Sequence, residues 1–449
     1  MGQALLFLGA AFTVVALVHY YLWRRLVRST TRTKRGRRFG TWVLVGLSAL
    51  VVATFVGSRV FGHGLAVILS WPGYLWLAVM FYLLIALALL ELPALLGRFL
   101  LRRRAVKIAP ARERALVGAL ALPADQGAQP ALPPDQGAMA ADRRSNHGQG
   151  FLIDGEGVAA GGVAGVAAGR ADEENVSRRL FLARAVAITA GLASVGVVTA
   201  GVGSAMGPPQ LKRVQIPLAK LPRSADGLRI ALVADIHLGP LRGVSHTRRI
   251  VDMVNGLDAD LIAVVGDLVD GSVAELGAAA APLRDLRSRH GAFFVTGNHE
   301  YYSGYEEWND EVARLGVRPL RNEWLEISGG IDLAGVNDVT GQSYGDGPDF
   351  DKALAGRDPS RLVVMLAHQP IQAAGAAARG VDLQLSGHTH GGQMVPFNLI
   401  VKLAQQPVVS GLGEVDGMPV YVTNGAGFWG PPVRVGAPPD ITLVQLRAP

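Results

Sequence analysis

The fold of this chain is decided by a series of polar motifs, the last of which reads Ser386-Gly387-His388-Thr389-His390-Gly391-Gly392-Gln393. Four earlier motifs lead up to it along the chain: Asp235-Ile236-His237, Gly266-Asp267-Leu268-Val269-Asp270, Gly297-Asn298-His299-Glu300 and Ala367-His368-Gln369. Each of the five motifs ends or directly follows a short apolar run, over residues 228–234, 260–265, 292–296, 362–367 and 381–385. Such runs, rich in Val, Ile, Leu and Phe, are typical of buried strands.

Every motif therefore stands at the carboxyl end of a predicted strand. In open α/β sheets these strand ends form the crevice in which ligands bind. Helical stretches, such as residues 244–256 and 305–315, alternate with the strands, which indicates an α/β fold. We expect the side chains of the five motifs to meet in one place.

The residue types in these motifs favour a metal site. Aspartates and histidines with one Asn carbonyl, and no cysteine, form a mixed oxygen and nitrogen ligand set that suits Mn, Fe or Zn. One carboxylate, with Asp267 as the candidate, could bridge two divalent ions about 3.5–4 Å apart, the spacing of two-metal sites that displace phosphoryl groups. Metal binding lowers the pKa of water from about 15.7 towards about 7, so we expect a metal-bound hydroxide to attack a phosphomonoester or phosphodiester.

Single residues in these motifs have simpler interpretations. Asp270 could cap the helix that follows it instead of orienting another side chain. Trp429 and Arg434 could touch a substrate, or Trp429 could pack a rigid loop. His246 and His290 lie among charged neighbours outside any motif, and we interpret both as solvated surface residues. The five motifs in one order favour a functional site over these separate interpretations.

In this order the motifs resemble the calcineurin-like metallophosphoesterase superfamily, whose pattern is D-x-H, GD-x-x-D, GNH-[DE], H and GH-x-H. The resemblance covers roughly residues 228–446 and implies a metal-dependent phosphoric ester hydrolase. The implied fold is a four-layer α/β sandwich, in which two mixed β-sheets are flanked by helices. By the same resemblance, one metal ion would be held by Asp235, His237, Asp267 and His390, and the other by Asp267, Asn298, His368 and His388.

The resemblance also assigns catalytic residues. His299 would stand beside the phosphate as general acid or transition-state stabiliser, and Asp270 would orient it. Residues 297–304, 386–393 and 424–434 look like a membrane-attached, often Tat-exported branch of the superfamily.

The rest of the chain is too apolar for one soluble domain. Its 449 residues are 50% hydrophobic, with a mean hydropathy of +0.28. Four segments are predicted to span a membrane, at residues 3–23, 41–58, 72–97 and 185–206. Each could instead be a buried core helix, but about 18 or more residues without a central charge favour a spanning helix.

Basic residues set the predicted orientation. Residues 24–38 hold eight Lys and Arg and no acid, and further basic clusters stand at residues 98–107 and 178–184. Positive loops stay in the cytoplasm, so four crossings from an outside N-terminus place residues 207–449 on the extracytoplasmic side of the cell membrane. Ser177-Arg178-Arg179-Leu180-Phe181-Leu182 resembles a twin-arginine translocation signal, or is one more positive anchor. No clean cleavage site follows, so we expect the domain to stay tethered.

The charge balance argues against a nucleic-acid partner. Although the pI is about 9.8, the 22 basic and 10 acidic residues before Pro209 contrast with 21 basic and 26 acidic residues from there on. The basic excess therefore faces anionic lipid headgroups. The expected partners are membrane lipids, a phosphoester substrate that is lipid-linked or cell-wall-linked, and the twin-arginine translocase.

We predict four regions: three transmembrane helices with a basic cytoplasmic loop (1–106), a flexible low-complexity linker (107–176), a twin-arginine-like segment with the fourth transmembrane helix (177–208) and a catalytic domain (209–449). Two alternatives stay open for the domain. It could keep the metal site to bind phosphate ligands or scaffold a partner, or it could be an accessory domain of a membrane sensor or transporter. The spans hold few ionisable groups, chiefly His19 and Glu91, which favours an anchor.

Overall fold

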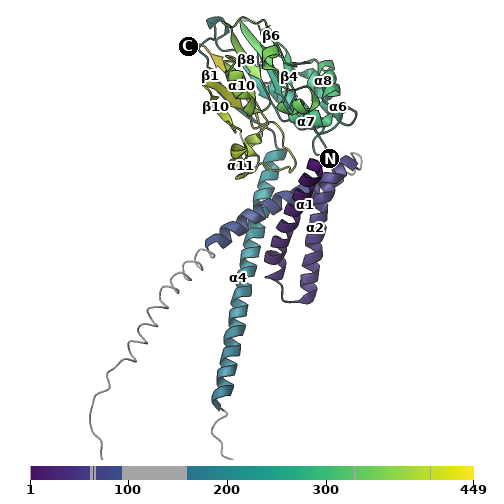
Figure 1. Cartoon of the computed structure of the whole chain (residues 1–449), viewed down its shortest axis with the longest axis vertical. Coiled ribbons are helices and arrows are strands. Elements are labelled where there is room, and N and C mark those ends of the chain that lie inside the picture. The colour runs from purple at the N-terminus through teal and green to yellow at the C-terminus, as the bar shows by residue number, and fades with distance from the viewer. Residues whose placement is uncertain (1, 61–63, 65–66, 94–158, 328–329, 405) are drawn as a thin grey trace, which may run out of the picture.

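The computed structural model describes residues 2–60, 64, 67–93, 159–327, 330–404 and 406–449. Within these residues, two six-stranded sheets form the upper part of the molecule and long helices extend below them (Figure 1).

The first sheet has the strand order β1-β12-β2-β3-β4-β5. Its strands are β1 (Gln210–Pro217), β12 (Asp440–Arg447), β2 (Arg229–Val233), β3 (Leu261–Val265), β4 (Ala292–Val295) and β5 (Val317–Pro319). β12 runs antiparallel to β2, and the other neighbours are parallel. The central strands are apolar and almost wholly buried, as expected for parallel strands covered on both faces.

The second sheet has the order β10-β11-β9-β8-β7-β6. Its strands are β10 (Gly411–Val415), β11 (Met418–Val422), β9 (Leu383–Ser386), β8 (Leu362–Leu366), β7 (Ile331–Gly335) and β6 (Glu323–Ile327). The two edge strands run antiparallel to their neighbours, and the inner four strands are parallel. Both sheets are therefore mixed.

Apolar side chains fill three interfaces between four layers. The middle interface joins residues such as Leu232 of the first sheet with Leu366 of the second. Helices α5 (Val244–Asn255), α6 (Val273–Ala280) and α8 (Tyr305–Arg314) cover the first sheet, while α9 (Phe350–Ala353) and α10 (Ala373–Ala377) cover the second. The predicted four-layer sandwich is thus confirmed.

Short helical turns occupy the loops between these elements. They are α7 (Asn298–Ser303), α11 (Phe397–Leu403) and the 3-10 segments Arg223–Ala225, Ala281–Asp285, Val339–Tyr344, Pro370–Gln372 and His390–Gly392.

The chain before the sandwich forms long helices. They are α1 (Gly2–Leu22), which continues into a π-helical turn (Trp23–Arg28), α2 (Lys34–Val60), a helix over Val67–Pro93, and α4 (Ala159–Met206). In the part of the chain that the structure describes, three helical segments are long and apolar enough to cross a membrane: Lys34–Val56, Val67–Pro93 and Ser177–Met206. They correspond to the second, third and fourth predicted spans. The first predicted span forms α1, and its membrane crossing stays a prediction.

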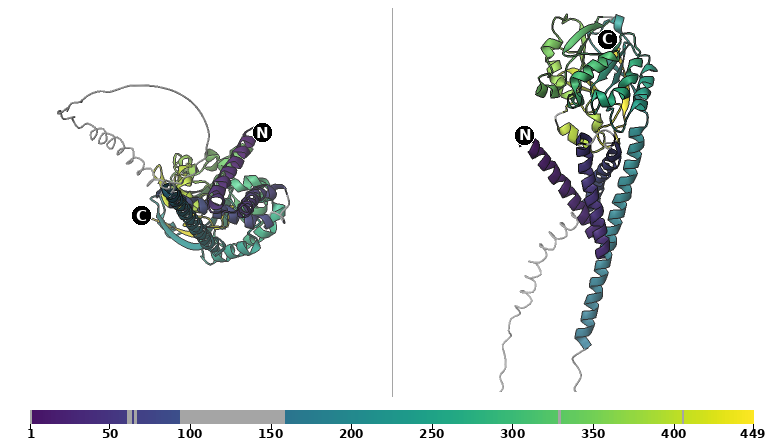
Figure 2. Two further views of the ribbon diagram at one scale, coloured as in Figure 1. Left: turned by 90° about the horizontal axis from the view of Figure 1, so that it is seen from below. Right: turned by 90° about the vertical axis from the view of Figure 1, so that its right-hand side faces the viewer.

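Helix α4 is longer than its predicted span. It has 48 residues and begins at Ala159, so the last part of the linker predicted over residues 107–176 is helical. Alanine is frequent in this part and is the strongest helix former. Residues 107–158 of the predicted linker lie outside the described residues. Figure 2 shows α4 extending past the other helices, away from the sandwich.

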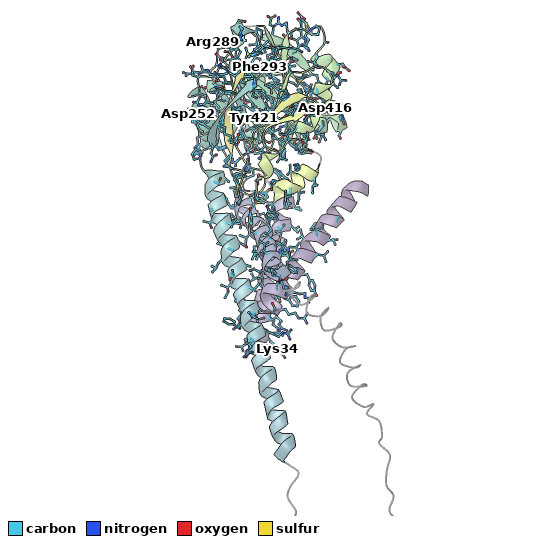
Figure 3. All side chains as sticks on the ribbon, turned by 90° about the vertical axis from the view of Figure 1, so that its left-hand side faces the viewer. Lys34, Asp252, Arg289, Phe293, Asp416 and Tyr421 are labelled. Carbon is cyan, nitrogen blue, oxygen red and sulfur yellow. The ribbon has the colours of Figure 1, made fainter. Side chains whose placement is uncertain are left out.

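The basic segments of the helices meet at the end of the bundle that is remote from the sandwich, where Figure 3 labels Lys34. Arg184 donates a hydrogen bond to the carbonyl of Thr30 at 3.0 Å, and Arg32 donates to the hydroxyl of Ser177 at 3.3 Å. Loop 24–38 and segment 178–184 therefore lie on the same side of the bundle.

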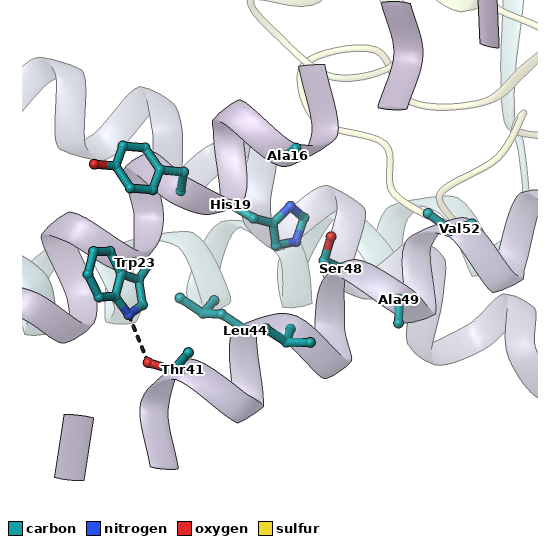
Figure 4. A pocket seen from close by; sticks show the side chains of 10 residues that line it. Ala16, His19, Trp23, Thr41, Leu44, Ser48, Ala49 and Val52 are labelled. Carbon is teal, nitrogen blue, oxygen red and sulfur yellow. Dashed lines mark hydrogen bonds between the residues drawn. The ribbon is translucent and has the colours of Figure 1, made fainter. Parts of the chain in front are cut away.

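Polar side chains inside the bundle are paired with one another. Glu91 forms an ion pair with Arg25. A pocket between α1 and α2 is lined in part by His19, Trp23 and Thr41 (Figure 4). The indole of Trp23 donates to Thr41 at 2.8 Å, and both ring nitrogens of His19 are engaged, one with the indole of Trp76 and one with a backbone carbonyl. These contacts are structural, consistent with an anchor.

The sandwich rests directly on the helices. The backbone N–H of Arg434 donates to the carbonyl of Gly201 in α4 at 2.9 Å, and the hydroxyl of Tyr82 donates to the carbonyl of Val395 at 3.0 Å. A Cβ atom at Gly201 would approach Val433 to 2.5 Å, so glycine permits this close contact. An apolar cluster joins the two parts through Ala78, Tyr82, Val198 and Val433.

The outer helical layer supplies a test of the fold. Trp308 of α8 is fully buried against the first sheet, and its indole donates to the carbonyl of Gly271 at 2.9 Å. We expect Trp308→Ala to lower the free energy of unfolding by about 3–5 kcal/mol because it leaves a large cavity. Thermal denaturation of the full chain in detergent would measure this, with exposed Leu412→Ala as the control. Equal melting temperatures for the two variants would contradict the packing described.

Candidate metal centre

The first cluster of predicted ligands forms where the loops after β2 and β9 meet. Asp235, His237 and His390 are all buried, and their candidate ligand atoms lie within 4.8 Å of one another. The Nε2 atoms of His237 and His390 are 3.1 Å apart, and Nε2 of His390 lies 3.5 Å from a carboxylate oxygen of Asp235. Three ligands thus face one small volume.

A second cluster forms from the loops after β3, β8 and β9. It contains Asp267, His368 and His388, whose candidate ligand atoms again lie within 4.8 Å of one another. Nε2 of His368 is 3.1 Å from Oδ2 of Asp267, and the side-chain oxygen of Asn298 is 3.0 Å from Nδ1 of His388. The amide of Asn298 therefore belongs with this cluster.

Asp267 stands between the two clusters. Its Oδ2 atom lies 3.1 Å from Nε2 of His368 on one side and 3.8 Å from Nε2 of His237 on the other. Its Oδ1 atom accepts a hydrogen bond from the backbone N–H of His299 at 2.9 Å. One oxygen held in place and one facing both clusters is the arrangement that a bridging carboxylate requires.

Asp270 links the first cluster to His299. One carboxylate oxygen of Asp270 lies 2.9 Å from Nδ1 of His237 and 2.6 Å from Nδ1 of His299. Helix α6 begins at Val273 and is capped by Ser272, so the alternative interpretation of Asp270 as a helix cap is wrong. The contact with Nδ1 of His237 leaves Nε2 of that ring for a metal ion, as is usual for metal-binding histidines.

The backbone at the ligands is unusual. Asp235, His237, Asp267, His388 and His390 all have φ between 49° and 72°, in the left-handed region that residues other than glycine seldom adopt. Such conformations cost about 1–3 kcal/mol each and cluster at functional sites, where the surrounding structure enforces them. Here they occur in the ligand residues that follow β2, β3 and β9.

Close packing around the bridging carboxylate explains why the third motif begins with glycine. A Cβ atom at Gly297 would lie 2.2 Å from Oδ1 of Asp267. Glu300, three residues later, is fully buried and accepts hydrogen bonds from the backbone N–H groups of Asp267, Leu268 and Gly297 at 2.6–2.9 Å. Glu300 therefore fixes the loop that carries the bridging carboxylate.

Arg434 supports the first cluster from behind. Its buried guanidinium donates to the carbonyls of His390, Asn424 and Gly427 and to Nδ1 of His390, the last at 2.8 Å. This contact lies on the Nδ1 side of the His390 ring, while Nε2 faces His237 and Asp235 in the cluster. Arg434 is therefore a supporting residue, and its predicted contact with substrate is wrong, because its guanidinium is buried.

Burial and mutual charge shift the pKa values of these groups in opposite directions. Burial, reinforced by Asp267, raises the pKa of Glu300 to about 7. Burial alone would also raise the pKa of Asp267, but His368, His299 and His237 hold it well below its usual value. Burial would lower the pKa of His299, yet Asp267 and Asp270 raise it to about 9. Protons bound to Glu300 and His299 thus offset part of the negative charge of the buried carboxylates.

The two clusters fit a pair of divalent cations. Within the described residues, Nε2 of His368 is buried and has no hydrogen-bond partner, although it faces Asp267. A buried imidazole nitrogen without a hydrogen-bond partner is expected to bind an ion. Carboxylate, imidazole and amide donors suit Mn, Fe or Zn.

The structure also corrects two interpretations of single residues. His246 is buried in α5, where burial and the nearby Arg242 and Arg249 lower its pKa to about 3, so it is not a solvated surface residue. Trp429 is 53% exposed, with its ring 6.3 Å from that of His299, so it lines the site instead of filling a loop interior. The support that Glu300 gives had no signal beyond its place in the third motif, and Arg434 had none beyond its place in segment 424–434.

Comparison with known proteins gives a consistent result. Residues 228–392 match the model of a family described as calcineurin-like phosphoesterase. A transmembrane protein with metallophosphoesterase domain from Bos taurus is 41% identical over 303 residues, which are 64% of this chain and 66% of that protein. An uncharacterized metallophosphoesterase from Helicobacter pylori strain J99 is 40% identical over 273 residues, which are 60% of this chain and 72% of the relative.

Among solved structures, the calcineurin-like phosphoesterase YfkN from Bacillus subtilis aligns with a TM-score of 0.30 and 15% identity, over 45% of this chain and 82% of that chain.

Glu300 offers a test of the support for the site. We expect Glu300→Gln to destabilise the domain by about 1–3 kcal/mol for each buried N–H left without its acceptor. Metal content should fall with it, because the loop that carries Asp267 is released. Thermal denaturation and elemental analysis of the purified chain would measure both, with exposed Glu307→Gln as the control. Wild-type stability and metal content in Glu300→Gln would rule out this role.

Proposed function

Since the chain belongs to the calcineurin-like metallophosphoesterase family, we propose that it hydrolyses phosphoester bonds with two divalent metal ions at a membrane surface. The observation that carries this proposal is the position of Asp267 between two clusters of ligands, with His299 hydrogen-bonded beside them. Asp235, His237, Asp267 and His390 would hold one ion, and Asp267, Asn298, His368 and His388 the other.

When bound, such ions lower the pKa of water and withdraw charge from the phosphate oxygens. The residues of the chain would do the rest. His299 directs Nδ1 towards Asp270 at 2.6 Å, and the two nearby carboxylates raise its pKa to about 9, so the free imidazole is protonated at neutral pH. Its other ring nitrogen would then donate a proton to the leaving-group oxygen. Bound cations would lower the pKa of His299 again and bring it closer to neutral pH.

The ligand set supports manganese, iron or zinc. Manganese is our first choice for reconstitution, because carboxylate and amide oxygens form about half of the donors. Either a monoester or a diester would suit two ions that contact attacking and leaving oxygens. With either ester, His299 would protonate the alkoxide leaving group.

We further propose that the catalytic domain lies outside the cytoplasmic membrane on a multi-pass anchor. Support comes from loop 24–38 and segment 178–184, which meet at the end of the bundle opposite the sandwich. Positive loops are retained in the cytoplasm, which leaves the sandwich on the other side. Arg178 and Arg179 would also serve as a twin-arginine signal for export of the folded domain.

The proposed roles predict different outcomes for two substitutions. Asp267→Asn should abolish hydrolysis of bis-p-nitrophenyl phosphate and p-nitrophenyl phosphate by the manganese-loaded full chain, and should lower its metal content. His299→Asn should lower kcat by about 100–10,000-fold on an alkyl phosphoester, whose alkoxide leaving group needs a proton, while metal content stays unchanged. His290→Asn, a partly exposed histidine outside the site, is the control. A wild-type chain that holds two ions yet hydrolyses neither ester would favour a binding or scaffolding role.

The proposed topology predicts which sites a membrane-impermeant maleimide reaches in intact cells. The chain has no cysteine, so Arg289→Cys in the sandwich and Arg35→Cys in the basic loop each create a unique site. We expect labelling of the first in intact cells and of the second only after permeabilisation. The reverse pattern would place the domain in the cytoplasm.

A further inference from the structure

Helix α11 exposes apolar side chains that the sandwich does not use. Phe397, Leu399, Ile400 and Leu403 are 39%, 60%, 54% and 83% exposed, and none of the seven residues of α11 is buried. Its polar side chains, Asn398 and Lys402, lie on one side of the helix by their spacing. A continuous exposed apolar face on a short helix marks a binding surface.

The position of α11 indicates what covers this face. Figure 1 shows α11 on the side of the sandwich that faces the long helices. The segment that leads into it contacts the bundle: Met394 packs against the cluster formed with Ala78 and Tyr82, and the carbonyl of Val395 accepts from the Tyr82 hydroxyl at 3.0 Å. The exposed face is therefore continuous with an interface between the sandwich and helices apolar enough to cross a bilayer.

The same segment is attached to the metal centre. Gly392, two residues after His390, packs so closely on α11 that a Cβ atom would lie 2.4 Å from Cα of Asn398. The side chain of Gln393 accepts from the backbone N–H of Trp429 at 2.9 Å and donates to its carbonyl at 2.8 Å. A ligand loop, α11 and the loop of Trp429 thus form one unit.

Exposed aromatic rings complete the surface beside the catalytic histidine. The ring of Trp429, 53% exposed, lies 6.3 Å from that of His299, and the ring of Tyr302, 63% exposed, lies 5.6 Å from it. Tryptophan and tyrosine are enriched where protein meets the headgroup region of a bilayer, because they join an apolar ring to a polar group. Lys402 can reach the headgroups from the other side of α11.

We propose that α11 and Trp429 lie in the interfacial layer of the bilayer, and that the metal centre takes the phosphoester of a lipid whose acyl chains remain in the membrane. The second part rests on the proposed phosphoesterase function. Both parts of such a lipid fit this surface. Its phosphate suits the two ligand clusters, and its apolar part suits the exposed apolar face of α11 beside them.

The position of α11 can be tested without any activity. In the cysteine-free chain, Leu403→Cys is labelled with an environment-sensitive nitrobenzoxadiazole dye, and the full chain is placed in phosphatidylcholine nanodiscs with or without doxyl-labelled lipid. We expect blue-shifted emission and at least twofold quenching by the doxyl lipid. Arg289→Cys, at the end of the sandwich far from the bundle (Figure 3), is the control and should show neither effect. An unquenched label at position 403 would overturn the membrane contact, and an unquenched label with blue-shifted emission would assign the face to a protein contact.

The substrate class is tested with the double variant Leu399→Asp/Leu403→Asp in vesicles. Phosphatidylcholine vesicles carrying dioleoylphosphatidic acid as monoester or phosphatidylglycerol as diester are compared with soluble p-nitrophenyl esters. We expect the hydrolysis rate of the double variant to fall at least tenfold on a vesicle substrate and less than twofold on the soluble ester. The control Arg289→Asp should keep both rates.

The outcomes separate the two proposals. A wild-type chain that hydrolyses soluble esters but neither lipid would overturn the lipid substrate, as would equal losses on both substrate types in the double variant. A wild-type chain inactive on every ester, with the label at position 403 quenched, would count against the phosphoesterase function and leave the membrane contact standing.

Discussion

The carboxylate of Asp267 is the group on which the rest of the site depends. It is buried between two sets of imidazoles, and one of its oxygens faces both. An isolated carboxylate would be too costly to hold there in ionised form. The nearby histidines and the backbone N–H of His299 stabilise the charge, while Glu300 holds the loop by accepting from the backbone N–H of Asp267. The loops that follow β4, β8 and β2 supply His299, His368 and His237 around this one charge.

Much of this arrangement could be predicted from the sequence, because the motifs and the apolar runs before them mark which side chains follow which strand. The α/β class was predicted on that basis, and the four-layer sandwich with two mixed sheets was predicted from the family resemblance; both are confirmed. The length of α4 was not predicted, since a segment rich in Ala and Gly is compatible with both a helix and a linker. The burial of His246 was missed because charged neighbours in sequence do not reveal which side of a helix faces the core.

The support around the ligands was beyond sequence reasoning for a different reason. The left-handed backbone of five ligand residues follows from packing by several loops at once, and no local pattern in the sequence indicates it. Arg434 is separated by 44 residues from the histidine that it contacts. Its neighbours Val433 and Val435 pack against the membrane helices, so the same short segment supports the metal centre and attaches the sandwich to its anchor.

The double attachment at Arg434 limits how far the sandwich can move relative to the helices. The backbone N–H of Arg434 donates a hydrogen bond to Gly201 in α4, and its side chain donates one to the carbonyl of His390. The sandwich is therefore fixed to the helices and does not move freely on a flexible linker. On a bilayer crossed by these helices, the metal centre would be held at a fixed height. A phosphate group at that height above the bilayer would reach the site by lateral diffusion. A phosphate group at the far end of a long surface polymer would lie too far from the site to bind.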